Sequence, residues 1–378
     1  MTNNISIGIF IADEGYGHAV RQITIIKNII NNFPNLDIHI YSGIRLSLIK
    51  SRLGNSIKYH YLNNLIRTFK TDSGGLDVDL TNEHFINIAN FGIIDWFKRA
   101  KFLNAFSHDI LIGDSIPQLS LAKSNSEAII INLSHFTWDW FWINMLKDPP
   151  VESKIFIDLY SKFDHYIFGY LTPSKNIDYY LNQKIHRIGL ILQNQPKSIL
   201  VENNFKKMQY NCLLMDNGTR TLSNLIEKAL PDLIYSEKLR FFVGIDSLSD
   251  SAKKIIVEST NMIPISGLKK MHETMIDSDF VVARGGFNTL SEVIAYKIPG
   301  LLIKETDNPE IAWNIEFAKS NNFCKSLDPN QMIKGLLDQI YEFINNDYQS
   351  IYESLTNTDI SLKGELDFCA LLKNILNL

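Results

Sequence analysis

Short apolar runs alternate with longer segments of helical periodicity along most of the chain. In a typical helical segment, residues 19–32, the apolar side chains Val20, Ile23, Ile26 and Ile29 share one face. Such alternation predicts parallel strands joined by crossover helices. In the first half, the runs of strand length are residues 5–12, 36–41, 57–62, 109–113, 128–133, 165–169 and 185–190.

A polar stretch at residues 192–208 interrupts this pattern, and a second series of runs follows it. After residue 340 only helical segments remain. We therefore expect an α/β protein with two Rossmann-like, doubly wound parallel-sheet domains that face a cleft. The expected boundaries are 1–195 for the first domain, 207–345 for the second, and 346–378 for a helical tail that packs back towards the first. The runs of the second series are residues 210–215, 239–243, 262–265, 280–283 and 300–303.

Composition restricts the classes of function. The chain has 378 residues, of which 45% are hydrophobic and 21% charged, as in globular proteins of two domains. A net charge of -4 argues against a general nucleic-acid-binding protein. Three scattered cysteines form neither a disulfide framework nor a zinc motif, which favours a cytoplasmic location. Since no apolar run reaches about 20 residues, we expect no membrane-spanning helix, and at most contact with the inner face of the membrane.

The first expected strand leads into a glycine-containing loop, Gly15-Tyr16-Gly17-His18. Glycines at a strand-to-helix turn let a ligand approach the backbone near the positive end of the helix. The third glycine of the dinucleotide fingerprint is missing, which disfavours a nicotinamide dehydrogenase. His18 stands where ligands bind in parallel sheets, although a helix-terminal histidine bonded to a carbonyl is an equally simple interpretation.

A second loop carries the stronger signal. The apolar run 280–283 leads into Arg284-Gly285-Gly286, and Asn288 and Thr289 then open a helix. Backbone N–H groups, hydroxyl donors and the helix dipole are together typical of a diphosphate site. The acidic stretch 305–310 offers carboxylates to ribose hydroxyls. Tight packing of the strand against the helix would explain the two glycines, but it gives no role to Arg284 or to the acidic stretch 305–310.

These two loops together resemble the GT-B glycosyltransferases, in particular the peptidoglycan N-acetylglucosaminyltransferase branch. The resemblance rests on the histidine loop and on a late Gly-Gly-x-x-Thr-x-x-Glu loop, and it covers nearly the whole chain. Residues 263–272 are similar to the segment that holds the nucleotide base in that family. Residues 15–21 and 134–140 also resemble a GT-B-like module found fused to sugar kinases.

The resemblance implies a set of site residues. His18 matches the family's catalytic base. The first loop is poorer in glycine than in the peptidoglycan enzyme, so that enzyme's acceptor does not transfer to this chain. The expected acceptor-side residues are Gly15, Tyr16, Gly17, Arg21, Trp138 and Asp139. The expected donor-binding residues are Asn217, Gly218, Thr219, Gly267, Leu268, Arg284, Gly285, Gly286, Asn288, Thr289 and Glu292, with Glu305 and Asn314 on the ribose side.

Glycosyl transfer without a metal needs a base for the acceptor hydroxyl and positive charge for the leaving diphosphate. A carboxylate that orients the imidazole improves His18 as a base, and Asp114, ahead of Glu14, is the expected partner. Asp114 could equally cap the turn before Pro117. Arg284 and the helix near Asn288 are expected to stabilise the departing nucleoside diphosphate.

Two further patterns bear on the reaction. The second glutamate of a retaining pair falls at position 300, which is glycine, so inversion is favoured. The Asp-x-Asp pairs at 77–79 and 277–279 offer a metal-dependent alternative, but the second precedes a buried strand, where caps are common. We expect no metal and no cofactor, with the nucleotide sugar as substrate.

The acceptor side is basic and aromatic. Residues 38–71 contain no acid and six lysines or arginines, and residues 85–106 combine aromatic and basic side chains. Such a surface suits a phosphate-bearing or lipid-linked acceptor, or an anionic membrane face. A solvated face beside ordinary core residues is the plainer alternative. Trp138 could stack on a sugar or belong to a buried helix.

The sequence therefore predicts an inverting, metal-independent glycosyltransferase with a UDP-sugar donor, acting in cell-surface glycan or glycolipid synthesis. A nucleotide-sugar hydrolase or epimerase on the same fold is the first alternative. A non-catalytic nucleotide-sugar-binding module is the second.

Overall fold

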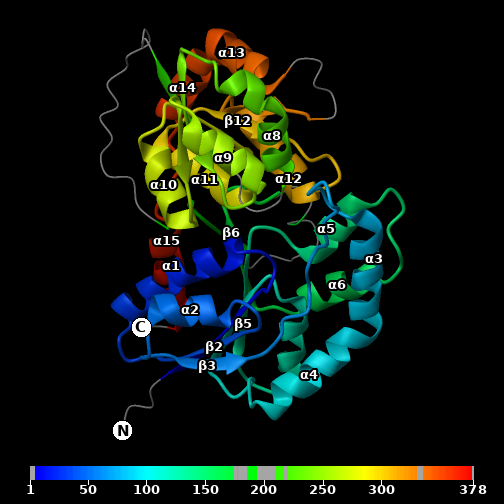
Figure 1. Cartoon of the computed structure of the whole chain (residues 1–378). Helices are drawn as coiled ribbons and strands as arrows, with labels where there is room; N and C mark the ends of the chain where they lie inside the picture. Colours follow the sequence, from blue (N-terminus) through cyan, green and yellow to red (C-terminus); the bar gives the residue numbers. More distant parts are fainter. Residues whose placement is uncertain are drawn as a thin grey trace. The chain divides into compact units, whose positions relative to one another are not determined.

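The computed structural model describes residues 5–173, 177, 185–193, 209–215, 220–329 and 335–376, and the chain forms two compact α/β units (Figure 1). Unit 1 comprises residues 1–69, 77–194 and 360–378, and unit 2 comprises residues 70–76 and 195–359. The boundary near the C-terminus therefore lies at residue 360 rather than at the expected residue 346. Within the described ranges, no helix has the length and apolar content needed to cross a bilayer.

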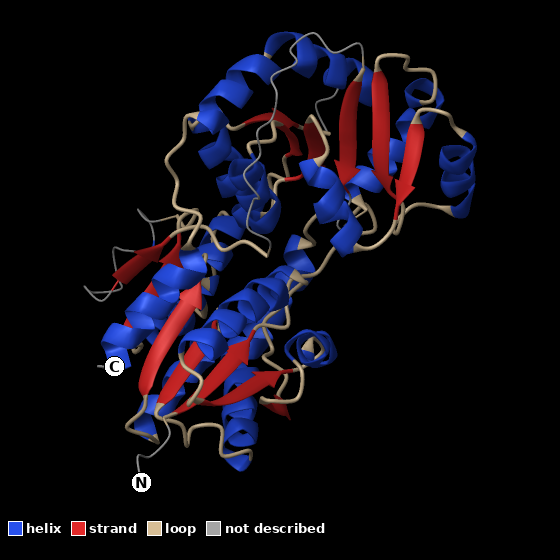
Figure 2. Ribbon diagram, turned by 90° about the vertical axis from the view of Figure 1, so that its left-hand side faces the viewer, coloured by secondary structure: helices blue, strands red, loops and turns tan. Residues whose placement is uncertain are grey.

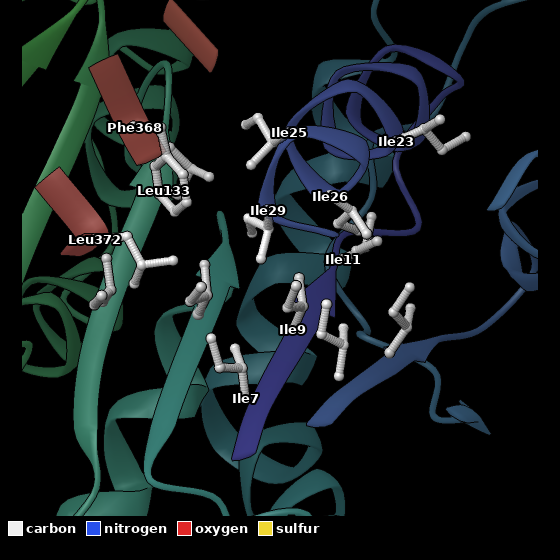
Figure 3. Packing of buried hydrophobic residues seen from close by; sticks show 14 of the residues in the cluster. Ile7, Ile9, Ile11, Ile23, Ile25, Ile26, Ile29, Leu133, Phe368 and Leu372 are labelled. Carbon is white, nitrogen blue, oxygen red and sulfur yellow. The ribbon is translucent and has the colours of Figure 1, made fainter. Parts of the chain in front are cut away.

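Unit 1 contains a seven-stranded, all-parallel sheet in the order β3-β2-β1-β4-β5-β6-β7. Helices α1 and α2 and the last helix, α15, lie on one face (Figure 3). The elements are β1 (Ser6–Ile11), α1 (Gly17–Asn32), β2 (Asp37–Ser42), α2 (Leu46–Leu53), β3 (Lys58–Tyr61), α3 (Val78–Asn87), η1 (Ile88–Gly92), α4 (Ile93–Phe102), β4 (Ile110–Asp114), η2 (Pro117–Ser124), β5 (Ile129–Ser134), α5 (Trp138–Met145), α6 (Ser153–Tyr160), β6 (His165–Gly169), β7 (Ile185–Ile188) and α15 (Gly364–Leu376).

Unit 2 repeats this topology with six parallel strands in the order β10-β9-β8-β11-β12-β13, and Figure 2 shows strands of both sheets in red. The expected fold class, two doubly wound parallel sheets, is confirmed. The elements are β8 (Tyr210–Met215), α8 (Thr221–Leu233), β9 (Leu239–Gly244), α9 (Asp250–Glu258), β10 (Met262–Ile265), α10 (Leu268–Ile276), β11 (Phe280–Arg284), α11 (Phe287–Tyr296), β12 (Gly300–Ile303), α12 (Pro309–Ser320), β13 (Cys324–Leu327), α13 (Leu336–Asn346) and α14 (Tyr348–Thr356).

Every expected strand is present, each within one or two residues of the range read from the sequence. The edge strand β13 was not expected. Its sequence, Cys-Lys-Ser-Leu, is polar at both central positions, which are only partly buried, so no continuous apolar run marks it.

Isoleucine dominates one face of the first sheet. Ile7, Ile9 and Ile11 of β1 alternate towards α1, where Ile26 and Ile29 face them (Figure 3). Helix α15 completes this core from the far end of the sequence, with Phe368, Cys369 and Leu372 fully or almost fully buried. The last helix is therefore a structural part of unit 1.

The opposite face of the same sheet carries three histidines in contact. His39 Nδ1 lies 3.0 Å from His60 Nε2, and the rings of His39 and His108 are 4.4 Å apart. His108 is bonded on both sides, to Ser6 Oγ at 2.7 Å and to the Tyr41 hydroxyl at 2.8 Å. A Cβ at Gly8 would lie 2.6 Å from the His108 ring, so glycine there makes room for the cluster.

The charged groups around these rings are few. Asp37 accepts hydrogen bonds from His39 and from Lys58, and Asp109 lies next to His108 in the chain. Burial, together with the neighbouring His39 and His60, lowers the pKa of His108 to about 4, and burial also lowers the pKa of His60. Both shifts favour the neutral forms of His60 and His108.

This cluster should make unit 1 sensitive to acid. Because the folded state resists protonation of His108, the unfolded state binds more protons between about pH 6.5 and pH 4. The free energy of unfolding should fall across that window by about 2 kcal/mol on account of His108. Thermal unfolding measured at several pH values tests this. In His108→Gln, which retains hydrogen-bonding atoms but cannot titrate, the decrease should be clearly smaller; an unchanged decrease would contradict the assignment.

Candidate active site

The loop after β1 is held by its two carboxylates. Asp13 accepts hydrogen bonds from the backbone N–H groups of Gly43 and Asn64, at 2.9 and 2.8 Å, and so ties together the segments that follow β1, β2 and β3. Glu14 accepts from both the N–H and the hydroxyl of Thr68, at 2.8 and 2.6 Å. The Glu14 carboxylate is therefore engaged by Thr68 rather than by His18, and the expectation that it supports the base is wrong for this structure.

His18, in the first turn of α1, meets Asp114 at the end of β4. Its Nδ1 lies 3.1 Å from Asp114 Oδ2, and both side chains are buried. Parallel strands β1 and β4 are neighbours, and ligands of such sheets bind at the carboxyl ends of the strands. The two residues expected to form the catalytic pair are therefore brought together there.

Arg21 lies one helical turn after His18 and joins the same cluster. Its Nη2 is 2.5 Å from Asp114 Oδ1 and 3.1 Å from His18 Nδ1, and its Nη1 donates to Nδ1 of His135 at 2.8 Å. The side chain is 5% exposed. The expected acceptor-side role of Arg21 is wrong for this structure, because its guanidinium serves the buried cluster.

The charges of this cluster fix its proton positions. Burial by itself raises the pKa of Asp114, but the adjacent Arg21 and His18 outweigh it and hold the pKa below its usual value. Arg21 Nη2 lies as close to His18 Nδ1 as Asp114 Oδ2 does, at 3.1 Å, but it lies closer still to Asp114 Oδ1, at 2.5 Å, and we assign its hydrogen bond to that oxygen. A carboxylate oxygen accepts but cannot donate, so with this assignment the proton between Asp114 Oδ2 and His18 belongs to Nδ1. That tautomer leaves a lone pair on Nε2, to which none of the described residues donates a hydrogen bond.

His135 was not among the expected site residues. It follows the carboxyl end of β5, the neighbour of β4, and this position in the sheet was the available signal. Trp138 and Asp139, expected to contact the acceptor, are 1% and 0% exposed. The Trp138 ring packs edge-on against Phe136 and Phe85, so it belongs to the core and offers no face to a sugar.

The exposed side of the first loop is aromatic and basic. Tyr16 is 52% exposed, and the Arg45 guanidinium lies 4.1 Å from its ring centroid. Arg45 Nε also donates to the carbonyl of Gly15 at 2.8 Å, where a φ of +55° favours glycine. No carboxylate among the described residues pairs with Arg45. Gly17 begins α1.

The second loop, between β11 and α11, contains two glycines with different environments. A Cβ at Gly285 would lie 2.5 Å from Ile315 of α12, so this glycine allows close packing. A Cβ at Gly286 would meet nothing within 4 Å. Gly286, at the N-terminus of α11, therefore leaves open space beside the positive end of a helix.

Arg284 and Glu305 form a bidentate ion pair across the ends of β11 and β12. Arg284 Nε and Nη2 donate to the two carboxylate oxygens at 2.6 and 2.8 Å. The Thr221 hydroxyl, at the start of α8, donates to Glu305 Oε1 at 3.3 Å. The expected roles, Arg284 on the leaving group and Glu305 on ribose, require correction, because each group's charge is offset by the other in this structure.

The remaining donor-side residues fall into two groups. Asn314 is buried and donates to the Gly285 carbonyl at 3.1 Å, so it holds the loop instead of facing a ribose. Glu292 Oε1 lies 2.7 Å from His272 Nδ1 of α10, and Thr289 is buried beside it on α11, whereas Asn288 is half-buried.

Two further segments were expected on the donor side. Gly267 donates its N–H to Asp246 at 2.8 Å and has a φ of +83°, and Leu268 begins α10. Asn217, Gly218 and Thr219 lie outside the described residues.

Comparisons with known proteins extend these observations. No protein-family model matches the chain. The UDP-N-acetylglucosamine--N-acetylmuramyl-(pentapeptide) pyrophosphoryl-undecaprenol N-acetylglucosamine transferase of Staphylococcus aureus is 21% identical over 377 residues, covering 96% of this chain and 97% of that protein.

Solved structures agree on the fold. MurG of Acinetobacter baumannii superposes with a TM-score of 0.61 at 12% identity, covering 98% of this chain and 99% of that one. A UDP-glucosyltransferase of Polygonum tinctorium gives a TM-score of 0.68 at 10% identity and covers 99% of both chains. The resemblance expected from the two loops is confirmed: along nearly its whole length the chain is similar in sequence to a peptidoglycan N-acetylglucosaminyltransferase, and it shares the fold of GT-B glycosyltransferases.

Proposed function

We propose that the protein is an inverting, metal-independent glycosyltransferase that moves a sugar from a UDP-sugar to an acceptor hydroxyl. The observation that carries the proposal is the buried His18–Asp114 pair at the carboxyl edge of the first sheet. The donor class follows from the relatives. The Staphylococcus aureus protein uses UDP-N-acetylglucosamine, and the Polygonum tinctorium protein is a UDP-glucosyltransferase.

The proposed step makes one bond and breaks one. The acceptor oxygen attacks the anomeric carbon while the bond from that carbon to the diphosphate oxygen breaks. The acceptor proton moves to Nε2 of His18, and Asp114 stabilises the imidazolium that results. Arg21 keeps Asp114 ionised, because its charge lowers the pKa of that carboxyl. The electron pair leaves with the nucleoside diphosphate.

The leaving group is proposed to lie at the second loop. The N-terminus of α11, which begins beside Gly286, supplies partial positive charge without a metal ion. Since Arg284 is paired with Glu305, its part is to brace the loop. Position 300 begins β12 and is glycine, so the second carboxylate of a retaining pair has no counterpart there. One base acting on the acceptor is the arrangement of an inverting enzyme.

We propose a phosphate-bearing, lipid-linked acceptor from the cell-surface glycan or glycolipid class. Arg45, held over Tyr16 beside the first loop, carries a charge that no described carboxylate offsets. A guanidinium fixed in this way suits a phosphate group. The Staphylococcus aureus relative acts on a pyrophosphoryl-undecaprenol substrate, which is of this class.

A lipid-linked acceptor requires contact with a membrane surface, and the α4 face offers one. This face is defined by Phe91, Ile94 and Phe102, which are 70%, 57% and 88% exposed, and by the basic residues Lys98, Arg99 and Lys101. Large apolar side chains beside lysine and arginine favour binding to an anionic bilayer. We therefore propose that the protein acts at the inner face of the membrane.

The donor loop can be tested by comparing its two glycines. Gly286→Val should fold normally, because its side chain enters open space, and should lose most of its affinity for UDP in calorimetry. Gly285→Ala should instead lower the melting temperature, because its Cβ would collide with Ile315. Unchanged UDP affinity in folded Gly286→Val would refute this placement of the diphosphate.

The base can be tested with His18→Ala. Turnover of a UDP-sugar with a phosphate-bearing lipid acceptor should fall by roughly 100-fold or more, whereas UDP affinity should barely change. Free sugar released at the full rate without acceptor would indicate a hydrolase, a changed sugar an epimerase, and binding without turnover a non-catalytic module. Full activity of His18→Ala would remove His18 from the mechanism.

The α4 face can be tested with vesicles. The double variant Phe91→Ser/Phe102→Ser should sediment at least several-fold less with vesicles that contain phosphatidylglycerol than the wild type does. Tyr235→Ser, at an 80% exposed position in unit 2, is the matched control and should bind like the wild type. Equal sedimentation of all three proteins would argue against this membrane surface.

A further inference from the structure

The chain that follows β5, as far as the first residue of α5, holds Asp114 from two directions. It carries His135, which contacts Arg21, and Trp138, which contacts the residue after Asp114. Neither His135 nor Trp138 is accessible to a substrate, since both are buried. Each nevertheless makes one hydrogen bond to a neighbour of the carboxylate that orients His18.

The first contact acts through the backbone of Ser115. This residue has a φ of +57°, a left-handed conformation that is unfavourable for a side chain other than glycine. Trp138 Nε1 donates a 2.9 Å hydrogen bond to the Ser115 carbonyl, and the bond is buried. Such a conformation persists only where the surroundings enforce it, and this bond lies directly beside Asp114.

Trp138 is itself firmly placed. Its backbone N–H donates to the Tyr160 hydroxyl at 3.3 Å, and its ring is held edge-on by Phe85, Phe136 and Phe141. A ring fixed in this way has little freedom, so the indole N–H is a rigid reference point for the turn that ends β4.

The second contact acts through Arg21. His135 Nδ1 accepts from Arg21 Nη1 at 2.8 Å, and this bond turns Nη2 of the same guanidinium towards Asp114 and His18. Because the guanidinium is planar, fixing one end fixes the other. The carboxylate thus has Arg21 at Oδ1 and His18 at Oδ2.

We propose that His135 and Trp138 are positioning residues that hold Asp114 from both sides and thereby keep the proton of His18 on Nδ1 and its lone pair on Nε2. The inference rests on the proposed function, because it concerns the base of that reaction. It also gives a physical reason for the two sequence segments around residues 15–21 and 134–140, which meet at Asp114: His18 and Arg21 come from one, and His135 and Trp138 from the other.

The chain offers a matched pair of tryptophans for the test. Trp142, on the same helix, is also fully buried, packs edge-on against Phe85, and donates its Nε1 proton at 2.7 Å to Asn82. Trp138→Phe and Trp142→Phe each lose one indole hydrogen bond and similar packing. Only Trp138→Phe loses a bond that leads to Asp114.

The principal readout needs no substrate. In protein labelled with ¹⁵N-histidine, with His18 assigned by comparison with His18→Gln, NMR reports which ring nitrogen carries the proton. The wild type and Trp142→Phe should show His18 protonated on Nδ1, and Trp138→Phe should show a mixture of both tautomers. His135→Leu should show the same mixture, and His135→Asn, which retains an acceptor for Arg21, should restore the wild-type pattern.

Kinetics supply the second readout. With the transferase assay, kcat of Trp138→Phe should fall about 10- to 100-fold at unchanged donor KM, the range found for partners that orient active-site groups. Trp142→Phe should keep kcat within about twofold. A wild-type tautomer of His18 in Trp138→Phe, or equal losses in both tryptophan variants, would overturn the proposal. If the NMR result holds but no transfer occurs with any donor, the proposed function fails and the positioning role stands.

Discussion

The buried ion pair between Arg21 and Asp114 is the constraint on which the first unit's site depends. A carboxylate with no exposure to water is costly unless it is paired and hydrogen-bonded on all sides. Here the end of β4 contributes the carboxylate, α1 contributes its two partners, Arg21 and His18, and the segment after β5 contributes His135, which holds Arg21. Three elements are therefore linked through one buried charge. The imidazole orientation follows from satisfying that charge. Removing Arg21 or His18 would leave the buried Asp114 carboxylate incompletely paired, which would destabilise the folded state.

The two units use one topology for different purposes. In unit 1 the carboxyl edge of the sheet gathers buried ionisable groups, His18 and Asp114 among them. In unit 2 the equivalent edge pairs its charges, Arg284 with Glu305, and leaves open backbone at Gly286. The first arrangement is suited to moving a proton, and the second to receiving an anion. The division of labour lies in the loops, since the strand orders correspond.

The sequence predicted the fold because strands buried on both faces are continuous apolar runs, and it predicted His18 and Asp114 because each ends or follows such a run. It did not predict what polar residues pair with. Arg21, Arg284 and Glu305 were assigned to ligands, yet their charges are met by partners 93 and 21 residues away. For Trp138 the sequence left two possibilities open, stacking on a sugar or burial in a helix, because aromatic composition does not reveal which ring finds neighbours. Such pairings depend on tertiary distances that local patterns do not encode.

Helix α15 has a consequence for biosynthesis. Its side chains complete the isoleucine core of unit 1, although the rest of that unit lies before residue 195. On a ribosome the first unit therefore emerges early but lacks part of its core until α15 leaves the exit tunnel. Unit 2, whose sequence is complete by residue 359 apart from the short stretch 70–76 made earlier, can finish folding sooner. The unit whose synthesis begins first is completed only after the sequence of unit 2 has been made.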